Sequence, residues 1–194
     1  MGSDPKGVPG RVPVEERLNI FALVIYVPDP LGRFLDDLRR ELVPHYNPHA
    51  HVSVLPPRPL AGDWCEASEQ VRALMESRAA FDIELSSVQR FPVTDVIYID
   101  VSGGASDLYS IHATMNSNCL AFHEPFPYHP HITLAQEVPH EDVARIQDLA
   151  FRRWENFVGE RKFRAEKAVF VQNTLSGVWM DLAEYSIGTN GAKL

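Results

Sequence analysis

The 194-residue sequence has no long apolar run, and its best candidate, residues 20–27, is only eight residues long. A membrane-spanning helix needs about 20 apolar residues, so the sequence predicts no membrane partner. Residues 1–13 hold three glycines and three prolines without the apolar centre of a secretion signal. We therefore expect a cytoplasmic protein.

Cysteine and positive charge are also scarce. The two cysteines, Cys65 and Cys119, have no metal-ligand spacing, which favours two free thiols. The net charge is −8, whereas proteins that grip long nucleic acids usually carry a basic surface. Residues 152–153 and 161–164 form basic clusters that could guide a small anion or a strand end. A solvated helix end and loop is the simpler interpretation.

Length and patterning predict one domain. We expect a flexible tail over 1–13, a single bilobal domain over 14–188 and a C-terminal tail over 189–194. Leucines at helical spacing predict a helix over 31–42, and Asp63 is a suitable N-cap for a helix over 63–78. Two further helices are predicted over 106–118 and 140–157. Strands are predicted over 19–27, 81–89, 95–101, 163–171 and 177–184.

Two short segments share one pattern. Residues 51–54 read His-Val-Ser-Val and residues 131–134 read His-Ile-Thr-Leu. Successive side chains of a strand point to opposite faces, so His51 shares a face with Ser53 and His131 shares a face with Thr133. Each segment is therefore predicted to be a strand with an apolar back and an imidazole beside a hydroxyl on its front. The prolines of 56–59 are expected to end the first strand.

The order of elements also repeats. Strand, helix, histidine segment, helix and two strands occur over 19–101 and again over 95–184, with 96–100 and 178–182 in equivalent places. Phe81 follows His51 by 30 residues, and Phe163 follows His131 by 32. This order indicates an internal duplication with two lobes related by a pseudo-two-fold axis. Such an axis would bring the two histidine segments face to face.

Two facing imidazoles suit acid–base chemistry. Histidine titrates near pH 6.5, so one copy can be neutral and the other protonated near neutrality. In-line phosphoryl transfer needs a base for the attacking hydroxyl and an acid for the leaving oxygen. The hydroxyls of Ser53 and Thr133 could then donate hydrogen bonds to the non-bridging oxygens. This chemistry requires no metal.

The two segments resemble the paired His-x-Thr/Ser-x motifs of the 2H phosphoesterase superfamily. Residues 126–135 are similar to the second-motif region of its 2'-5' RNA ligase (LigT-like) branch, and the resemblance covers roughly 18–187. It implies an α+β bilobal fold with two antiparallel sheets around a central cleft, and helices outside. It also implies catalysis by His51 and His131, phosphate binding by Ser53 and Thr133, and no metal or other cofactor. Ser53 stands where threonine is commoner, and the hydroxyl is kept.

The resemblance further implies substrates with a 2',3'-cyclic phosphate, either RNA ends or small cyclic nucleotides. It favours His131 as the base and His51 as the acid, with the roles exchanged in the reverse reaction. Water as nucleophile gives hydrolysis, and an RNA 5'-hydroxyl gives a 2'-5' linkage. We expect a monomer without a protein partner.

Other side chains near the two segments are weaker candidates. Arg58 could meet a phosphate or a base, or be a surface turn residue. Phe126 and Tyr128 could stack on a base or pack beneath their loop. Four other histidines are expected to be surface or structural residues: His45, His112, His123 and His140. The tryptophans are expected to serve the core: Trp64, Trp154 and Trp179.

Two alternatives remain. His49 and His129 could join His51 and His131 in a zinc site, which would make the protein a zinc-dependent hydrolase. The prolines at positions 48 and 130 instead favour irregular loop for His49 and His129. The other alternative is a non-catalytic module of the same fold that binds nucleotides or RNA.

Overall fold

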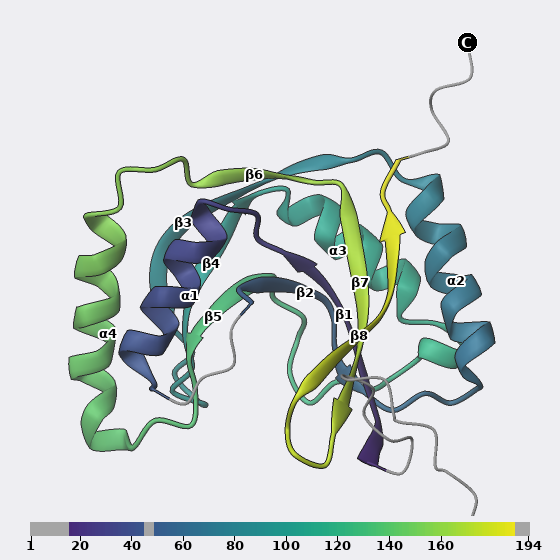
Figure 1. Cartoon of the computed structure of the whole chain (residues 1–194), viewed down its shortest axis with the longest axis horizontal. Coiled ribbons are helices and arrows are strands. Elements are labelled where there is room, and N and C mark those ends of the chain that lie inside the picture. The colour runs from purple at the N-terminus through teal and green to yellow at the C-terminus, as the bar shows by residue number, and fades with distance from the viewer. Residues whose placement is uncertain (1–15, 45–48, 189–194) are drawn as a thin grey trace, which may run out of the picture.

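The computed structural model describes residues 16–44 and 49–188, so the predicted tails and His45 lie outside the described residues. The described chain forms two four-stranded antiparallel sheets and four α-helices (Figure 1), which confirms the predicted α+β fold. The helices are α1 (Leu31–Leu42), α2 (Trp64–Ser77), α3 (Ala105–Met115), α4 (His140–Glu155) and the 3-10 turn Asn118–Leu120. The strands are β1 (Arg17–Tyr26), β2 (His51–Arg58), β3 (Phe81–Arg90), β4 (Ile97–Gly103), β5 (His131–Ala135), β6 (Lys162–Ala165), β7 (Lys167–Thr174) and β8 (Trp179–Ser186).

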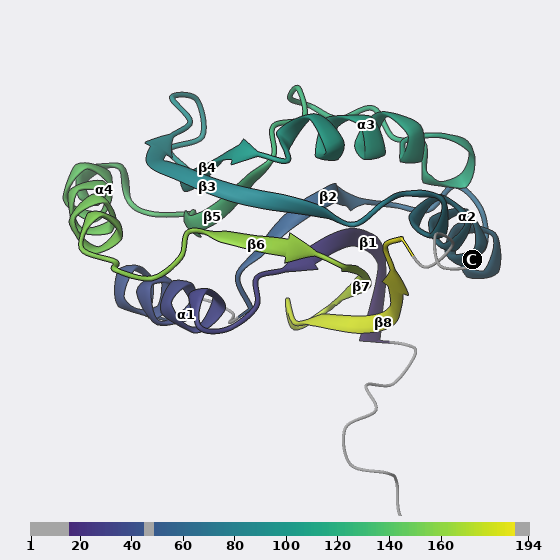
Figure 2. The same cartoon turned by 90° about the horizontal axis from the view of Figure 1, so that it is seen from above.

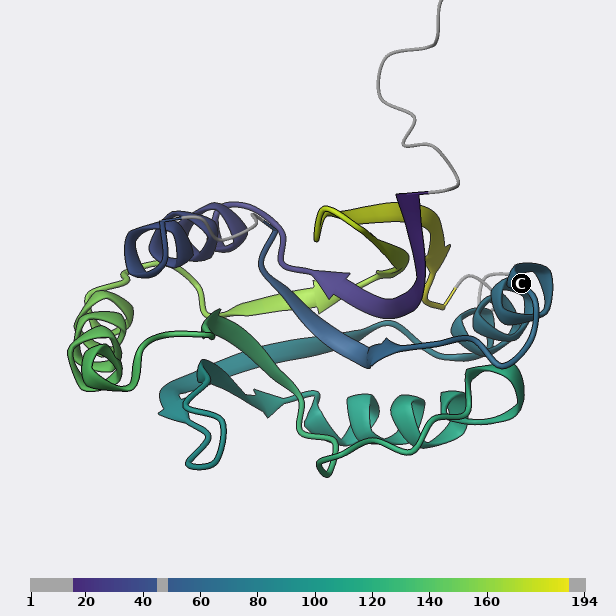
Figure 3. The ribbon, with the colours of Figure 1, turned by 90° about the horizontal axis from the view of Figure 1, so that it is seen from below.

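Each sheet carries one histidine segment on an edge strand. Sheet A has the order β2-β1-β7-β8, and sheet B has the order β5-β4-β3-β6. The edge strands β2 and β5 contact each other, and they lie side by side when the molecule is seen from below (Figure 3). The histidine segments of the two sheets therefore meet at the centre of the molecule.

The helices are exchanged between the two lobes. Helix α1 follows β1 of sheet A, yet it packs against β5 of sheet B, next to α4. Helix α3 follows β4 of sheet B and packs against β2 of sheet A, next to α2 (Figure 2). Each histidine strand thus packs against a helix that comes, in the chain, directly after a strand of the other sheet. This arrangement ties the two lobes together.

Helix α1 shows why the bounds of a helix could be predicted from the sequence pattern alone. Its buried leucines recur every three or four residues and lie on one face, as in an amphipathic helix. Gly32 allows the first turn to approach β1, because a Cβ there would lie 2.2 Å from the Val27 carbonyl oxygen. The predicted bounds, 31–42, are confirmed. Asp63 also caps α2 as predicted, and its carboxylate accepts a hydrogen bond from the Glu66 backbone N–H at 2.9 Å.

One large apolar core draws on both sheets and all four helices, and a smaller cluster lies on the other face of sheet A. The tryptophans belong to these cores as predicted. Trp154 is fully buried, Trp64 stacks on Phe170, and Trp179 covers the smaller cluster. No helix in the described ranges combines the length and apolarity needed to cross a membrane.

Strand β2 ends at Arg58, inside the proline-rich stretch 56–59 as predicted. The strand includes the first two prolines of this stretch, because an edge strand tolerates residues without an N–H. Two other strand predictions were wrong. The predicted strand over 163–171 divides at Glu166 into β6 in sheet B and β7 in sheet A. Residues 96–100 and 178–182 are not equivalent, because β4 neighbours the histidine strand of its sheet whereas β8 lies on the far edge. The counterpart of β4 is β1.

Candidate active site

The two histidine strands alternate as their sequence predicts. On β2, Val52 and Val54 are fully buried, whereas His51 and Ser53 are half-buried. On β5, the buried and half-buried positions follow the same order, with Ile132 and Leu134 behind His131 and Thr133. Among the described residues, neither hydroxyl has a hydrogen-bond partner, so both are available to a ligand.

His51 and His131 are held in the same way. Nδ1 of His51 lies 2.8 Å from the His49 carbonyl oxygen, and Nδ1 of His131 lies 2.6 Å from the His129 carbonyl oxygen. A carbonyl can only accept, so each Nδ1 carries the proton and each neutral Nε2 keeps a lone pair. Within the described chain, neither Nε2 has a hydrogen-bond partner. Both rings therefore present the nitrogen that can exchange a proton with a ligand.

The environment lowers the pKa of both imidazoles. Burial, the Arg39 charge and the charge of His131 lower the pKa of His51 to about 4. Burial and the charge of His129 lower the pKa of His131. The charge of His131 acts on the pKa of His51, which agrees with the contact between strands β2 and β5. Burial therefore favours the neutral form of both rings when no ligand is bound.

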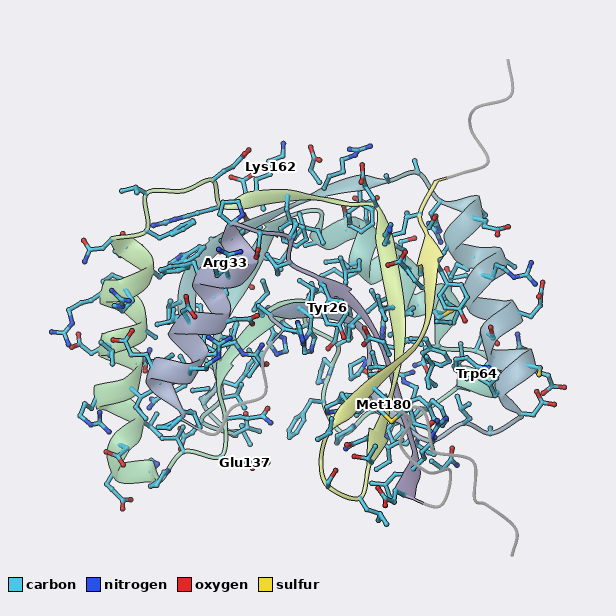
Figure 4. All side chains as sticks on the ribbon, in the orientation of Figure 1. Tyr26, Arg33, Trp64, Glu137, Lys162 and Met180 are labelled. Carbon is cyan, nitrogen blue, oxygen red and sulfur yellow. The ribbon has the colours of Figure 1, made fainter. Side chains whose placement is uncertain are left out.

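Aromatic rings flank both histidines. The Tyr26 ring meets His51 edge-on at 6.3 Å between centroids, and its hydroxyl donates to the Asp181 carboxylate at 2.6 Å. In sheet B, the centroid of the Tyr98 ring lies 5.2 Å from the centroid of the His131 ring. Figure 4 shows Tyr26 at the centre of the molecule, between the two lobes. Sequence reasoning missed these tyrosines, although each lies on the strand that pairs with a histidine strand.

His49 and His129 have separate surroundings. His129 Nε2 lies 2.8 Å from the Asp100 carboxylate, whereas His49 faces the Tyr26 ring at 5.6 Å and has a φ of 80°. In the part of the chain that the structure describes, no three side chains of the metal-binding types converge. Because a zinc site needs such convergence, the geometry does not favour the zinc alternative.

The loop before β5 gives its two aromatic candidates different surroundings. Tyr128 stacks on the buried His112 ring at 3.8 Å and donates its hydroxyl to the Ser53 backbone carbonyl at 2.9 Å. It therefore packs beneath the loop and supports β2. Phe126 is 55% exposed, so its ring is accessible to a base. His112 is structural as predicted, and His140 is a surface residue that bonds Asp95.

Arg58 does not reach the site surface, and the structure does not support its predicted contact with substrate. Its side chain is only 1% exposed and forms an ion pair with Glu124. The guanidinium also donates to the Asn116 side chain at 2.9 Å and to the Leu120 carbonyl at 3.2 Å. A buried guanidinium needs such partners, and here they come from the loop that leads to β5.

Comparisons with known proteins agree with this geometry. A family model described as the 2'-5' RNA ligase superfamily matches residues 27–174. A curated protein of Oceanobacillus iheyensis, named as an inferred phosphoesterase, is 26% identical over 124 residues, which are 59% of this chain and 71% of that protein.

Solved structures share the fold at low sequence identity. Escherichia coli LigT in complex with 3'-AMP has a TM-score of 0.57 and 12% identity, covering 89% of this chain and 98% of that one. The Thermus thermophilus protein TT0787 has a TM-score of 0.59 and 17% identity, covering 88% and 100%. Kluyveromyces marxianus Usb1 with uridine monophosphate has a TM-score of 0.50 and 14% identity, covering 88% and 99%.

Proposed function

Because the chain belongs to the 2'-5' RNA ligase superfamily, we propose that it is a metal-independent phosphoesterase that opens 2',3'-cyclic phosphates through His51 and His131. The observation that carries the proposal is the matched geometry of the two rings. Both donate Nδ1–H to the carbonyl two residues earlier and leave Nε2 open. The proton acceptor and the proton donor are then two copies of one arrangement.

The proposed reaction begins with substrate binding. The negative phosphate raises the pKa of the nearby imidazoles, so that one ring takes a proton from solvent. The neutral ring then removes a proton from the nucleophile as its oxygen bonds to phosphorus. The bond from phosphorus to one ribose oxygen breaks, and the protonated ring gives its proton to that oxygen. Ser53 and Thr133 donate hydrogen bonds to the non-bridging oxygens.

The surrounding charges do not separate the two roles. Arg39 lowers the pKa of His51 and Asp36 raises it, and His129 and Asp100 act in the same two directions on the pKa of His131. We therefore keep the assignment that the family resemblance implies, with His131 as the base and His51 as the acid in the hydrolytic direction.

The substrate class rests on charge and on the structural relatives. LigT and Usb1 were solved with 3'-AMP and uridine monophosphate, which supports a nucleotide or the end of an RNA strand. The net charge of −8 disfavours long duplexes. The family description favours 2'-5' ligation as a second candidate activity, in which an RNA 5'-hydroxyl replaces water at the same site.

The test is turnover of 2',3'-cyclic AMP in EDTA, followed by chromatography and mass spectrometry of the product. We expect hydrolysis to a nucleoside monophosphate, and His51→Ala and His131→Ala should each lower kcat by about 10²–10⁴-fold. His140→Ala is the matched control, because that side chain is 88% exposed and should leave kcat unchanged. Addition of an RNA with a 5'-hydroxyl tests ligation.

Three results would contradict the proposal. Full activity of both folded histidine variants would remove these rings from the mechanism. Activity that is lost in EDTA and restored by zinc would favour the zinc hydrolase. Binding of the nucleotide without turnover of any cyclic phosphate would favour a non-catalytic module.

A further inference from the structure

The two histidine segments differ at the residue between their paired histidines. This residue is Pro130 in sheet B and Ala50 in sheet A. In both segments the second histidine of the pair donates its Nδ1–H to the backbone carbonyl of the first. Proline fixes φ and has no N–H, so Pro130 stiffens its segment without needing a partner. Alanine neither fixes φ nor lacks an N–H, so the segment in sheet A needs another group to hold its backbone.

Asp36 on α1 is the group that holds this backbone. Ala50 is 2% exposed, and a buried N–H needs an acceptor. The Asp36 carboxylate accepts from the Ala50 N–H at 2.6 Å, while the Ala50 carbonyl accepts from the Val27 N–H at 2.9 Å. The backbone between His49 and His51 is therefore held from two sides.

The backbone here also needs such support. His49 has a φ of 80°, which is costly for a residue with a side chain and persists only when its surroundings enforce it. The carbonyl of this residue accepts the Nδ1–H of His51. A change in the peptide between residues 49 and 50 would therefore move the acceptor that sets the tautomer and direction of the His51 ring.

We propose that Asp36 is a positioning residue that orients the His51 ring through the backbone of Ala50, in the role that Pro130 has for His131. Helix α1 also packs against β5, the strand of His131. One helix thus sets the first histidine through a hydrogen bond and supports the second through packing. The catalytic part of this inference rests on the proposed function.

The kinetic test compares three variants of Asp36 with a control on the same helix. Asp36→Ala removes the acceptor and should lower kcat about 10- to 100-fold with little change in KM, because misplacement of a catalytic group costs this much. Asp36→Asn keeps an acceptor oxygen and should retain most of the activity. Asp37→Ala is the control, because the Asp37 side chain is 62% exposed and should leave kcat unchanged.

Asp36→Glu keeps the charge but displaces the acceptor by one methylene, so kcat should fall here too. This variant keeps the test decisive if Asp36→Ala does not fold. Wild-type kcat in the folded Asp36→Ala and Asp36→Glu variants would overturn the proposal, as would equal losses in Asp36→Asn and Asp36→Ala.

A second measurement needs no turnover. The ¹⁵N chemical shifts of the His51 ring report its tautomer, and the wild type should show a proton on Nδ1. Asp36→Ala or Asp36→Glu should give a mixture of tautomers, whereas Asp36→Asn should preserve the wild-type spectrum. An unchanged His51 tautomer in Asp36→Ala and Asp36→Glu would overturn the positioning role, even in a protein that hydrolyses no cyclic phosphate. Inactivity of the wild type with the expected tautomer shifts would overturn only the proposed function.

Discussion

Replacement of Arg58 by methionine separates a structural role from a role in substrate binding. The substitution keeps an apolar stem of similar length and removes the guanidinium. Glu124, whose side chain is 11% exposed, then loses its arginine partner. The Asn116 side chain and the Leu120 carbonyl lose a donor as well. The loop from α3 to β5 would lose its main polar attachment to β2.

The size of the effect follows from this burial. Removing one partner of a buried ion pair costs about 3–5 kcal/mol, because the other charge remains buried. For a domain of this length, 1 kcal/mol corresponds to about 2–4 °C in Tm. Arg58→Met should therefore lower Tm by about 6–20 °C. Because the Arg58 side chain is buried and its guanidinium bonds the loop that leads to β5, KM for a cyclic nucleotide should change little below the transition.

The assay is thermal unfolding together with KM for 2',3'-cyclic AMP. Arg72→Met is the matched control, because its ion pair with Glu69 is exposed and worth about 0–1 kcal/mol. Combining Arg58→Met with Glu124→Leu should recover part of the lost stability, since it removes the buried carboxylate that Arg58 pairs with. A wild-type Tm with a strongly raised KM would refute this reasoning and restore Arg58 as a substrate contact.

Two further predictions concern His51 and Tyr26. Because burial holds the pKa of His51 at about 4, below its unfolded value of about 6.5, the unfolded chain binds the proton first as pH falls. The free energy of unfolding should therefore decrease from pH 6.5 towards pH 4, and less steeply in His51→Gln; equal slopes in urea titrations would contradict this. Tyr26→Phe removes the bond to Asp181 and should cost about 1 kcal/mol in urea unfolding while kcat stays near wild type. Tyr26→Ala also removes the ring beside His51 and should lower kcat; equal kcat values for the two variants would show that this ring does not support His51.

Elements with their own periodicity could be predicted from the sequence. The leucines of α1 mark one helix face, and Asp63 caps α2 through a bond to a residue three positions later. The alternation of β2 and β5 placed each candidate histidine beside its hydroxyl. These features depend on contacts between near neighbours in the chain.

Strand assignment to a sheet could not be predicted in the same way. The β-forming residues of 162–174 are concentrated after Lys167, yet both parts of the segment are strands, and β6 pairs with β3 whereas β7 pairs with β1. Nothing in the local pattern distinguishes the two partners, since both pairings bury similar side chains. The edge position of β2, which lets the strand include two prolines, could not be predicted either, because it depends on the order of the whole sheet.

The supporting residues of the site were hidden for a related reason. Asp36 looks like one more polar residue of an amphipathic helix, and Arg58 looks like a turn residue after prolines. Asp36 acts on a backbone 14 residues away, and Arg58 bonds residues about 60 positions away. Only the folded chain shows which polar groups are removed from water and must find partners there.

The sequence by itself determined the helices, the alternation of the two histidine strands and the pairing of each imidazole with a hydroxyl, because these follow from residue spacing along one element. Tertiary structure alone decided that α1 and α3 exchange lobes, that both rings expose Nε2 and that Asp36 supports His51. Those features arise where segments far apart in the chain come together and exclude water, and burial there sets both the hydrogen bonds and the pKa values.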